Sequence, residues 1–90
     1  MRACREVLIC NRRGLHARAA ALFAKTAQGF DAEITVIKAD LEVDGTSIMD
    51  LMMLAAGPGT TLRIETAGDD AEAALAALAD LVGAGFHEQG

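Results

Sequence analysis

Residues 11–29 read NRRGLHARAAALFAKTAQG and contain a polar loop, a helix and the signal that ends the helix. The loop ends at Gly14, and strong helix formers follow from Ala17 to Gln28. Gly29 is a typical residue for the C-terminal end of a helix. The apolar residues that fall at helical spacing are Ala20, Phe23, Ala24 and Ala27. The stretch therefore predicts a helix over residues 17–28 with one face packed against a core.

Alternation of apolar and polar residues predicts four strands around this helix, over residues 5–10, 32–37, 41–43 and 60–66. In the first strand Val7 and Ile9 would share one face, and the opposite face would carry Cys4, Glu6, Leu8 and Cys10. Two more helices are predicted over residues 48–56 and 71–82. The order βαββαβα predicts an α+β open-faced sandwich, in which three helices cover one face of a four-stranded antiparallel sheet, as a single domain over residues 1–90.

The composition argues against several classes of protein. No Trp, no Tyr and only three Phe are present, which is too few for a base-stacking RNA platform. The apolar runs are far shorter than the roughly 18 residues of a membrane span. The first residues also lack the apolar region of a signal peptide. We therefore expect a cytoplasmic protein with no membrane insertion.

The cysteines and histidines predict neither a disulfide nor a metal site. Cys4 and Cys10 would lie about 20 Å apart along a strand, too far for a disulfide. The two Cys and two His do not have the spacing of a zinc site. Walker, dinucleotide-binding and Gly-x-Ser-x-Gly patterns are missing, so we expect no cofactor and no self-contained kinase, dehydrogenase or hydrolase.

Charge is divided unevenly along the chain. Residues 1–30 hold six basic residues and one acidic residue, whereas residues 31–90 hold two basic and twelve acidic residues. The net charge of −5 disfavours general binding of nucleic acid. The basic first third indicates a local site for an anion or for an acidic partner surface, and the alternative is an ordinary solvated surface.

His16 falls where the loop meets the predicted helix over residues 17–28. The first N–H groups of a helix have no internal partner and attract anions such as a phosphoryl group. Arg18 could add charge-assisted hydrogen bonds, and Gly14 permits a close approach of the backbone. A neutral imidazole keeps a lone pair that can attack phosphorus. The segment predicts a nucleophilic histidine in an anion site, and the alternative is a surface histidine that only begins a helix.

The helix predicted over residues 48–56 is apolar almost all round. A domain of this size cannot bury every side of it, so some of Ile48, Met49, Met52 and Met53 should be exposed as a docking patch. The alternative is that they pack inside or against a dimer partner. Ser47 would begin the helix as its N-cap, with Asp50 as the capping-box partner.

Three segments together resemble the HPr family, the histidine-containing phosphocarriers of the bacterial phosphoenolpyruvate phosphotransferase system. The segments are 11–20 (NRRGLHARAA), 29–34 (GFDAEI) and 45–57 (GTSIMDLMMLAAG). They follow one another at the spacing of the family, and the resemblance covers nearly the whole chain. The family also has a βαββαβα fold, in agreement with the order of elements derived above.

The resemblance implies a role for each matching residue. His16 matches the phosphorylated histidine and Arg18 the phosphate-binding arginine. Ser47 matches the serine modified by HPr kinase/phosphorylase in many members. The residues that match the partner-docking surface are Ala20, Ile48, Met49 and Met52. The phosphoryl group would come from phosphoenolpyruvate through enzyme I and pass to an EIIA-type acceptor.

The chain departs from the family pattern at two positions. Ala19 stands where many members have Pro. Unlike Pro, Ala has a backbone N–H in the first turn, which could donate toward the phosphoryl group. Asp50 stands where many members with a regulatory serine have Gly, and its charge would oppose phosphorylation of Ser47. Residues 52–57 (MMLAAG) look more like the regulatory or nitrogen-type members than the sugar-dedicated ones.

Two other functions stay open from the sequence. One is a regulatory binding module without histidine chemistry, acting through Ser47 and the Met-rich helix. The other is a generic α+β interaction domain. Neither needs Gly14, His16 and Arg18 together at one helix start, so the phosphocarrier hypothesis is preferred.

Overall fold

Four strands form one antiparallel sheet in the order β1-β4-β2-β3, in a computed structural model that describes residues 1–88. Val36 on β2 lies at the centre of this sheet, opposite Val43 on one side and Ile64 on the other. The elements in chain order are β1 (Arg2–Leu8), α1 (Ala17–Gln28), β2 (Glu33–Lys38), β3 (Leu41–Asp44), α2 (Ile48–Met53), β4 (Thr61–Ala67), α3 (Ala71–Gly83) and the 3-10 turn η1 (Gly85–His87).

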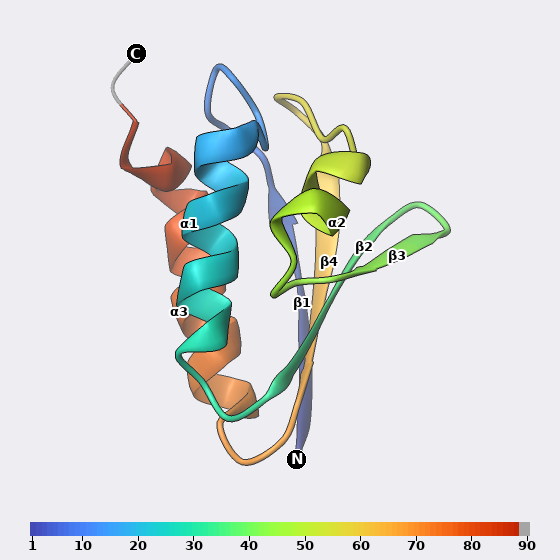
Figure 1. The fold of residues 1–90 in the computed structure, drawn as a ribbon, viewed down its shortest axis with the longest axis vertical. Helices are drawn as coiled ribbons and strands as arrows, with labels where there is room; N and C mark the ends of the chain where they lie inside the picture. Colours follow the sequence, from blue (N-terminus) through green and yellow to red (C-terminus); the bar gives the residue numbers. More distant parts are fainter. Residues whose placement is uncertain (89–90) are drawn as a thin grey trace.

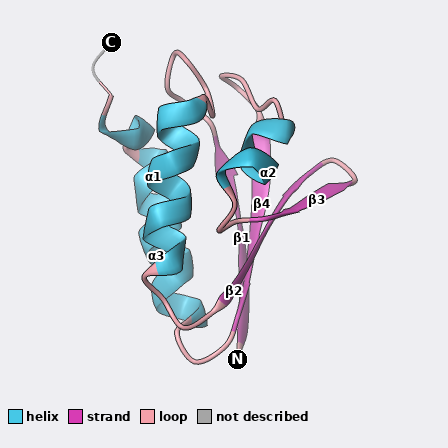
Figure 2. Ribbon diagram, in the orientation of Figure 1, coloured by secondary structure: helices cyan, strands magenta, loops and turns pink. Residues whose placement is uncertain are grey.

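Helices cover one face of the sheet and leave the other face open, as predicted (Figures 1 and 2). The covered face of the sheet contributes buried aliphatic side chains, and the helices contribute small and aliphatic ones and the aromatic ring of Phe23. All four apolar residues predicted for the buried face of α1 are 1% exposed or less. The main members of the core are Ile9, Phe23, Ile34, Val36, Leu51, Leu62, Ile64, Leu78 and Val82.

Most predicted boundaries agree with the structure to within one residue. The predicted bounds of α1 are confirmed, because the strong helix formers end directly at Gly29. The first strand is displaced: it runs over Arg2–Leu8 instead of 5–10, because Arg2 already pairs with Ala67 on β4. Ile9 is still buried, and its N–H donates to the Thr60 carbonyl, 2.9 Å away, in the turn before β4.

The helix predicted over residues 48–56 ends earlier, at Met53. Leu54 is buried and its carbonyl accepts a hydrogen bond of 2.9 Å from Lys38 Nζ. Ala55 then takes a left-handed backbone conformation, with φ of 49°, which stops the helix. Contacts with the end of β2 therefore decide where α2 ends, and the local sequence pattern could not show them.

The last residues that the structure describes, up to Glu88, return to the start of α1. After α3 the turn η1 buries Phe86, which is 4% exposed, against the core. Figure 1 shows the C-terminal segment beside the first turn of α1. Within residues 1–88 the longest helix has 13 residues, and none is long and apolar enough to cross a membrane.

Candidate functional site

The loop before α1 is held by a close approach of two backbone segments. Gly14 has a φ of +66°, and a Cβ added to it would lie 2.5 Å from the carbonyl oxygen of Ala56. The same oxygen accepts a hydrogen bond of 2.8 Å from the N–H of Leu15, whose side chain is buried. The requirement for glycine that the sequence indicated at position 14 is confirmed, and the segment after α2 fixes the residue before His16.

His16 is the N-cap residue of α1. Its backbone is extended, with φ of −77° and ψ of 179°, and its carbonyl accepts the first bond of the helix from Ala20 N–H, at 2.8 Å. The N–H groups of residues 17–19 lie before this bond and have no acceptor in the helix. The structure therefore places the imidazole at the positive end of a 12-residue helix, where an anion is stabilised.

The imidazole has an acidic partner that the sequence reasoning missed. His16 Nε2 pairs with Oε2 of Glu88, and Oε1 of Glu88 accepts a hydrogen bond of 2.8 Å from Asn11 Nδ2. The Asn11 amide and the His16 ring, by these hydrogen bonds, hold the pKa of the Glu88 carboxyl below its usual range. No acid was expected near His16, because Glu88 is 72 residues away in the sequence.

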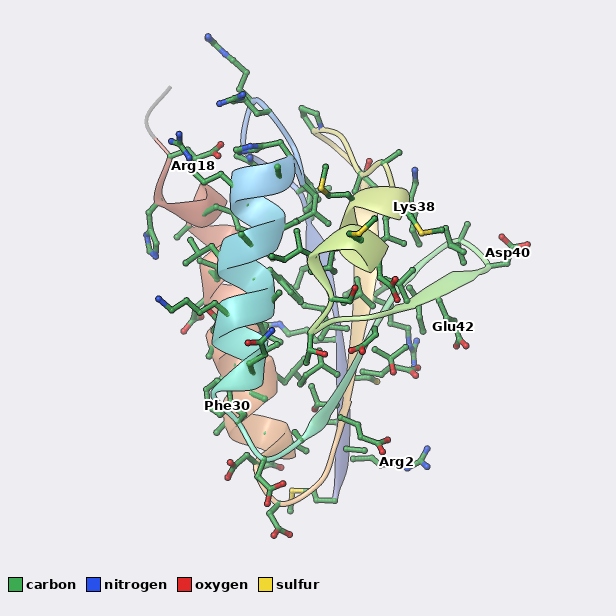
Figure 3. All side chains as sticks on the ribbon, viewed as in Figure 1. Arg2, Arg18, Phe30, Lys38, Asp40 and Glu42 are labelled. Carbon is green, nitrogen blue, oxygen red and sulfur yellow. The ribbon has the colours of Figure 1, made fainter. Side chains whose placement is uncertain are left out.

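Arg18 lies on the first turn of α1 and is exposed (Figure 3). It forms no ion pair with residues 1–88, so its guanidinium is available to a ligand. Arg12 and Arg13 are also exposed, in the loop just before His16. Three of the basic residues in the first third of the chain therefore lie at one end of the molecule.

A second surface lies on α2. The prediction that this helix exposes apolar side chains is confirmed: Ile48 is 42%, Met49 78%, Met52 45% and Met53 67% exposed, whereas Leu51 is buried. Ala20, predicted to contact a partner, is 0% exposed because it faces the core from α1. Ala20 is therefore a core residue, and of the four residues predicted to contact a partner only Ile48, Met49 and Met52, all on α2, are exposed.

Ser47 is the N-cap of α2, as predicted, and its Oγ accepts a hydrogen bond of 3.2 Å from Asp50 N–H. The other half of the predicted capping box is wrong. The Asp50 carboxylate accepts from Asp44 N–H at 3.4 Å, and the N–H of Ser47 donates to the Asp44 carbonyl at 3.1 Å. Asp is shorter than Glu, and the turn from β3 already supplies the acceptor that Ser47 N–H needs.

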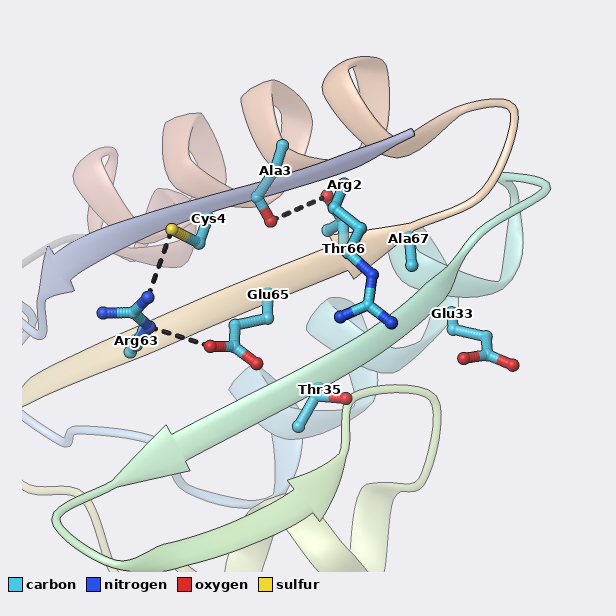
Figure 4. Close-up of a pocket in the computed structure, with 9 residues that line it drawn as sticks. All are labelled: Arg2, Ala3, Cys4, Glu33, Thr35, Arg63, Glu65, Thr66 and Ala67. Atoms are coloured by element: carbon cyan, nitrogen blue, oxygen red, sulfur yellow. Dashed lines mark hydrogen bonds and ion pairs between the residues drawn. The ribbon is translucent and has the colours of Figure 1, made fainter.

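The open face of the sheet contains a hollow of about 460 Å³, far from His16 in the fold (Figure 4). Arg63 is one of the residues that line it, with its Nε 2.9 Å from Glu65 Oε2 and its Nη2 3.3 Å from Cys4 Sγ. Both cysteines are free thiols. Among residues 1–88 no group of three His, Cys, Asp or Glu side chains is placed to hold a metal ion.

Comparisons with known proteins agree on one family. The family model "PTS HPr component phosphorylation site" matches residues 3–84. The chain is 46% identical to phosphocarrier protein NPr of Shewanella violacea over 84 residues, covering 93% of this chain and 92% of that protein. It is 48% identical to phosphocarrier protein HPr of Neisseria meningitidis serogroup A over 83 residues, covering 92% and 93% of the two chains. The crystal structure of HPr from Thermoanaerobacter tengcongensis superposes with a TM-score of 0.93 at 40% identity, covering 97% and 98% of the two chains.

Proposed function

The chain belongs to the HPr family of phosphotransferase-system phosphocarriers, and on this premise we propose that His16 is the residue that accepts and passes on the phosphoryl group. The observation that carries the proposal is the position of His16 as N-cap of α1, where the free N–H groups of the first turn can bind phosphoryl oxygens. The covalent intermediate would be a phosphohistidine, formed without a metal or cofactor in this chain.

The donor that we propose is phosphorylated enzyme I, charged from phosphoenolpyruvate in the cytoplasm, and the acceptor is an EIIA-type protein. The relatives include both an NPr and an HPr at similar identity, so both the nitrogen-type and the sugar-type EIIA belong in the test. Exposed Arg12 and Arg13 beside the site would attract acidic surfaces on these partners.

Arg18 would bind the transferred phosphoryl group. Its side chain is exposed on the first helical turn and has no competing ion pair within residues 1–88. The N–H of Ala19, which a proline would lack, is one of the free backbone donors of the same turn. These donors would balance the negative charge that stays on phosphorus during transfer.

The docking surface that we propose is the exposed face of α2. Ile48, Met49 and Met52 offer flexible apolar contact area. The hydrogen bond between Leu15 and Ala56 ties the segment that follows α2 to the loop that carries His16. A partner bound on α2 would therefore meet a loop whose position relative to that helix is fixed.

Ser47 is a candidate for phosphorylation by HPr kinase/phosphorylase, and we propose that Asp50 opposes this modification. Asp50 N–H bonds directly to Ser47 Oγ, so the carboxylate of the same residue lies in the turn that a phosphate would occupy. Kinase-catalysed phosphorylation of Ser47 should be faster in Asp50→Asn than in the wild type. Equal rates would show that the charge of Asp50 has no effect.

The test is transfer of phosphoryl groups from enzyme I to the chain and then to each purified EIIA. His16→Ala should neither accept nor pass on the group. Arg18→Ala should be phosphorylated more slowly while it keeps the wild-type circular dichroism, and Met49→Ala should need a higher concentration of partner. Normal transfer by His16→Ala would refute the proposal. Partner binding that is unchanged in His16→Ala, without any phosphoryl transfer in the wild type, would instead favour the regulatory binding module.

A further inference from the structure

Three of the four methionines of the chain lie close together on α2. They are Met49, Met52 and Met53, and the fourth is Met1. Residues three and four positions apart are neighbours on the surface of a helix, so Met52 and Met53 both lie next to Met49. These three side chains, which we call the methionine patch, therefore present three thioether sulfurs on one part of the helix surface.

The methionine patch is open to solvent. Met49 is 78%, Met52 45% and Met53 67% exposed, whereas Leu51, on the side of α2 that faces the core, is 0% exposed. A small reagent dissolved in water can therefore reach all three sulfurs in the folded protein. The fold does not depend on keeping these side chains away from water, because the core is formed by other residues.

Thioether sulfurs give this surface a reactivity that other apolar side chains would not give it. Methionine is oxidised to its sulfoxide, which is polar and chiral, and dedicated reductases return the sulfoxide to methionine. Leucine or isoleucine in place of the three methionines would supply similar apolar area without this reaction. Ile48, which is 42% exposed beside the patch, is such an inert side chain.

The oxidation needs only a hydroperoxide, of which hydrogen peroxide is the simplest. A lone pair of the sulfur forms a bond to one peroxide oxygen as the O–O bond breaks. The departing hydroxide takes up the proton of the transferred oxygen and leaves as water. The sulfur is oxidised to a sulfoxide and the peroxide is reduced.

A sulfoxide in the patch would affect docking and leave the rest of the protein unchanged. In the free protein the new S=O group is hydrated, because these side chains are exposed. Against an apolar partner surface it would be buried without a hydrogen bond, which is unfavourable. His16 begins another helix, α1, so its chemistry does not require the sulfurs.

We propose that the methionine patch is an oxidative modification site: a hydroperoxide converts its side chains to sulfoxides and thereby weakens docking of partners on α2, and reduction of the sulfoxides restores docking. The inference rests on the proposed function and adds to it a means of regulation by oxidants. The chemistry at His16 stays intact in the oxidised form, so phosphoryl transfer resumes when the patch is reduced.

The test uses a Cys4→Ser, Cys10→Ser background, because both cysteines are exposed thiols that peroxide also oxidises. The background is treated with hydrogen peroxide, and catalase removes the peroxide before enzyme I is added. Peptide mass mapping counts the oxygens on each methionine. Met1 is an internal control, since it is 74% exposed and the N-terminus lies away from α2 (Figure 1). Phosphorylation by enzyme I then gives KM and kcat for the chain.

A matched variant carries Met49→Leu, Met52→Leu and Met53→Leu in the same background. Leucine keeps similar apolar volume and has no sulfur. This variant is compared with its own untreated form, so any effect of leucine on docking cancels. Urea unfolding of all four samples checks that the treatment leaves the fold unchanged.

We expect oxidation of the patch to raise KM about tenfold, the order of magnitude for burying one polar group without a hydrogen bond. The values of kcat and of the urea midpoint should not change. Methionine sulfoxide reductases that act on both epimers should restore KM. The triple leucine variant, with Met1 oxidised to the same extent, should keep its KM.

An unchanged KM in background protein that carries sulfoxides at all three positions would overturn the proposal. An equal rise of KM in the triple leucine variant would do the same. Untreated background that enzyme I does not phosphorylate would refute the proposed function instead. Calorimetric titration of enzyme I with the treated and untreated chain would then still decide whether oxidation weakens docking.

Discussion

Replacing Gly14 with alanine should destabilise the protein and displace the loop that carries His16. The added Cβ would lie 2.5 Å from the Ala56 carbonyl oxygen and 2.9 Å from Gly57 Cα, whereas ordinary contact begins near 3.4 Å. Both neighbours are backbone atoms, so no side chain can rotate away. The φ of +66° adds a second cost, because a residue with a Cβ is strained there.

Three effects add up to the loss of unfolding free energy in Gly14→Ala. The left-handed backbone costs roughly 1–2 kcal/mol for a residue that is not glycine. Forcing an extra carbon into a packed site costs roughly 1–3 kcal/mol. Moving the loop weakens the hydrogen bond between Leu15 and Ala56, worth about 1 kcal/mol. We expect Gly14→Ala to lose roughly 3–6 kcal/mol of unfolding free energy, a large part of the total for a domain of this size.

Two other glycines supply matched controls in urea unfolding. Gly59 has a φ of +85° and nothing within 4 Å of an added Cβ, so Gly59→Ala measures backbone strain alone. Gly57 has open space and no positive φ, so Gly57→Ala should stay within about 0.5 kcal/mol of the wild type. The difference between Gly14→Ala and Gly59→Ala isolates the close approach to Ala56.

The same variant tests the link from the loop to the chemistry. A displacement of about 1 Å in a reacting group can slow a reaction roughly a hundredfold. Folded Gly14→Ala should therefore be phosphorylated far more slowly than Gly59→Ala. If Gly14→Ala loses no more unfolding free energy than Gly59→Ala, the loop can move without destabilising the protein. The close approach of Gly14 to Ala56 would then not constrain the loop.

Three further results follow from the structure. Lys38→Met should lower the unfolding free energy by about 1 kcal/mol in urea, because it removes the hydrogen bond to the Leu54 carbonyl; no change would mean that this bond does not stabilise α2. The folded protein lowers the pKa of Glu88 below its usual 4.5. The unfolding free energy of the wild type should therefore exceed that of Glu88→Gln by a difference that is complete above about pH 5 and shrinks as the pH falls below 4.5. A difference that grew in acid would contradict this. The rate of phosphorylation should fall as salt rises, since charges such as exposed Arg12 and Arg13 are screened beyond about 8 Å at physiological ionic strength; rates independent of salt would remove their proposed role in steering.

Local patterns in the sequence predicted the elements that local forces decide. The bounds of α1 were predicted because helix propensity, the apolar spacing and Gly29 all agree on them. The exposed α2 side chains followed from a helix that is apolar on more sides than a small domain can bury. The Gly-Leu-His-Ala-Arg motif predicted the position of His16 at a helix start, which the structure confirms.

Features that depend on distant residues could not be predicted in this way. The end of α2 is set by Lys38 and by the loop before His16, and no signal near Met53 indicates it. The pairing of His16 with Glu88 spans 72 residues and needs the left-handed turn η1. The one signal in the sequence was an acid after Gly85 and Phe86, which carries no information about its partner. For Ala20 the local pattern was the better guide. Its place on the apolar face of α1 predicted a core residue, and the structure buries it, whereas the resemblance implied a docking role.

The proposal that His16 carries the phosphoryl group is tested most directly by intact mass. The wild type and His16→Ala are incubated with phosphoenolpyruvate, magnesium and purified enzyme I, and each is weighed before and after brief acid treatment. A single acid-labile phosphoryl adduct on the wild type alone is the predicted result. An adduct on His16→Ala, or none on folded wild type with enzyme I from several sources, would contradict the account.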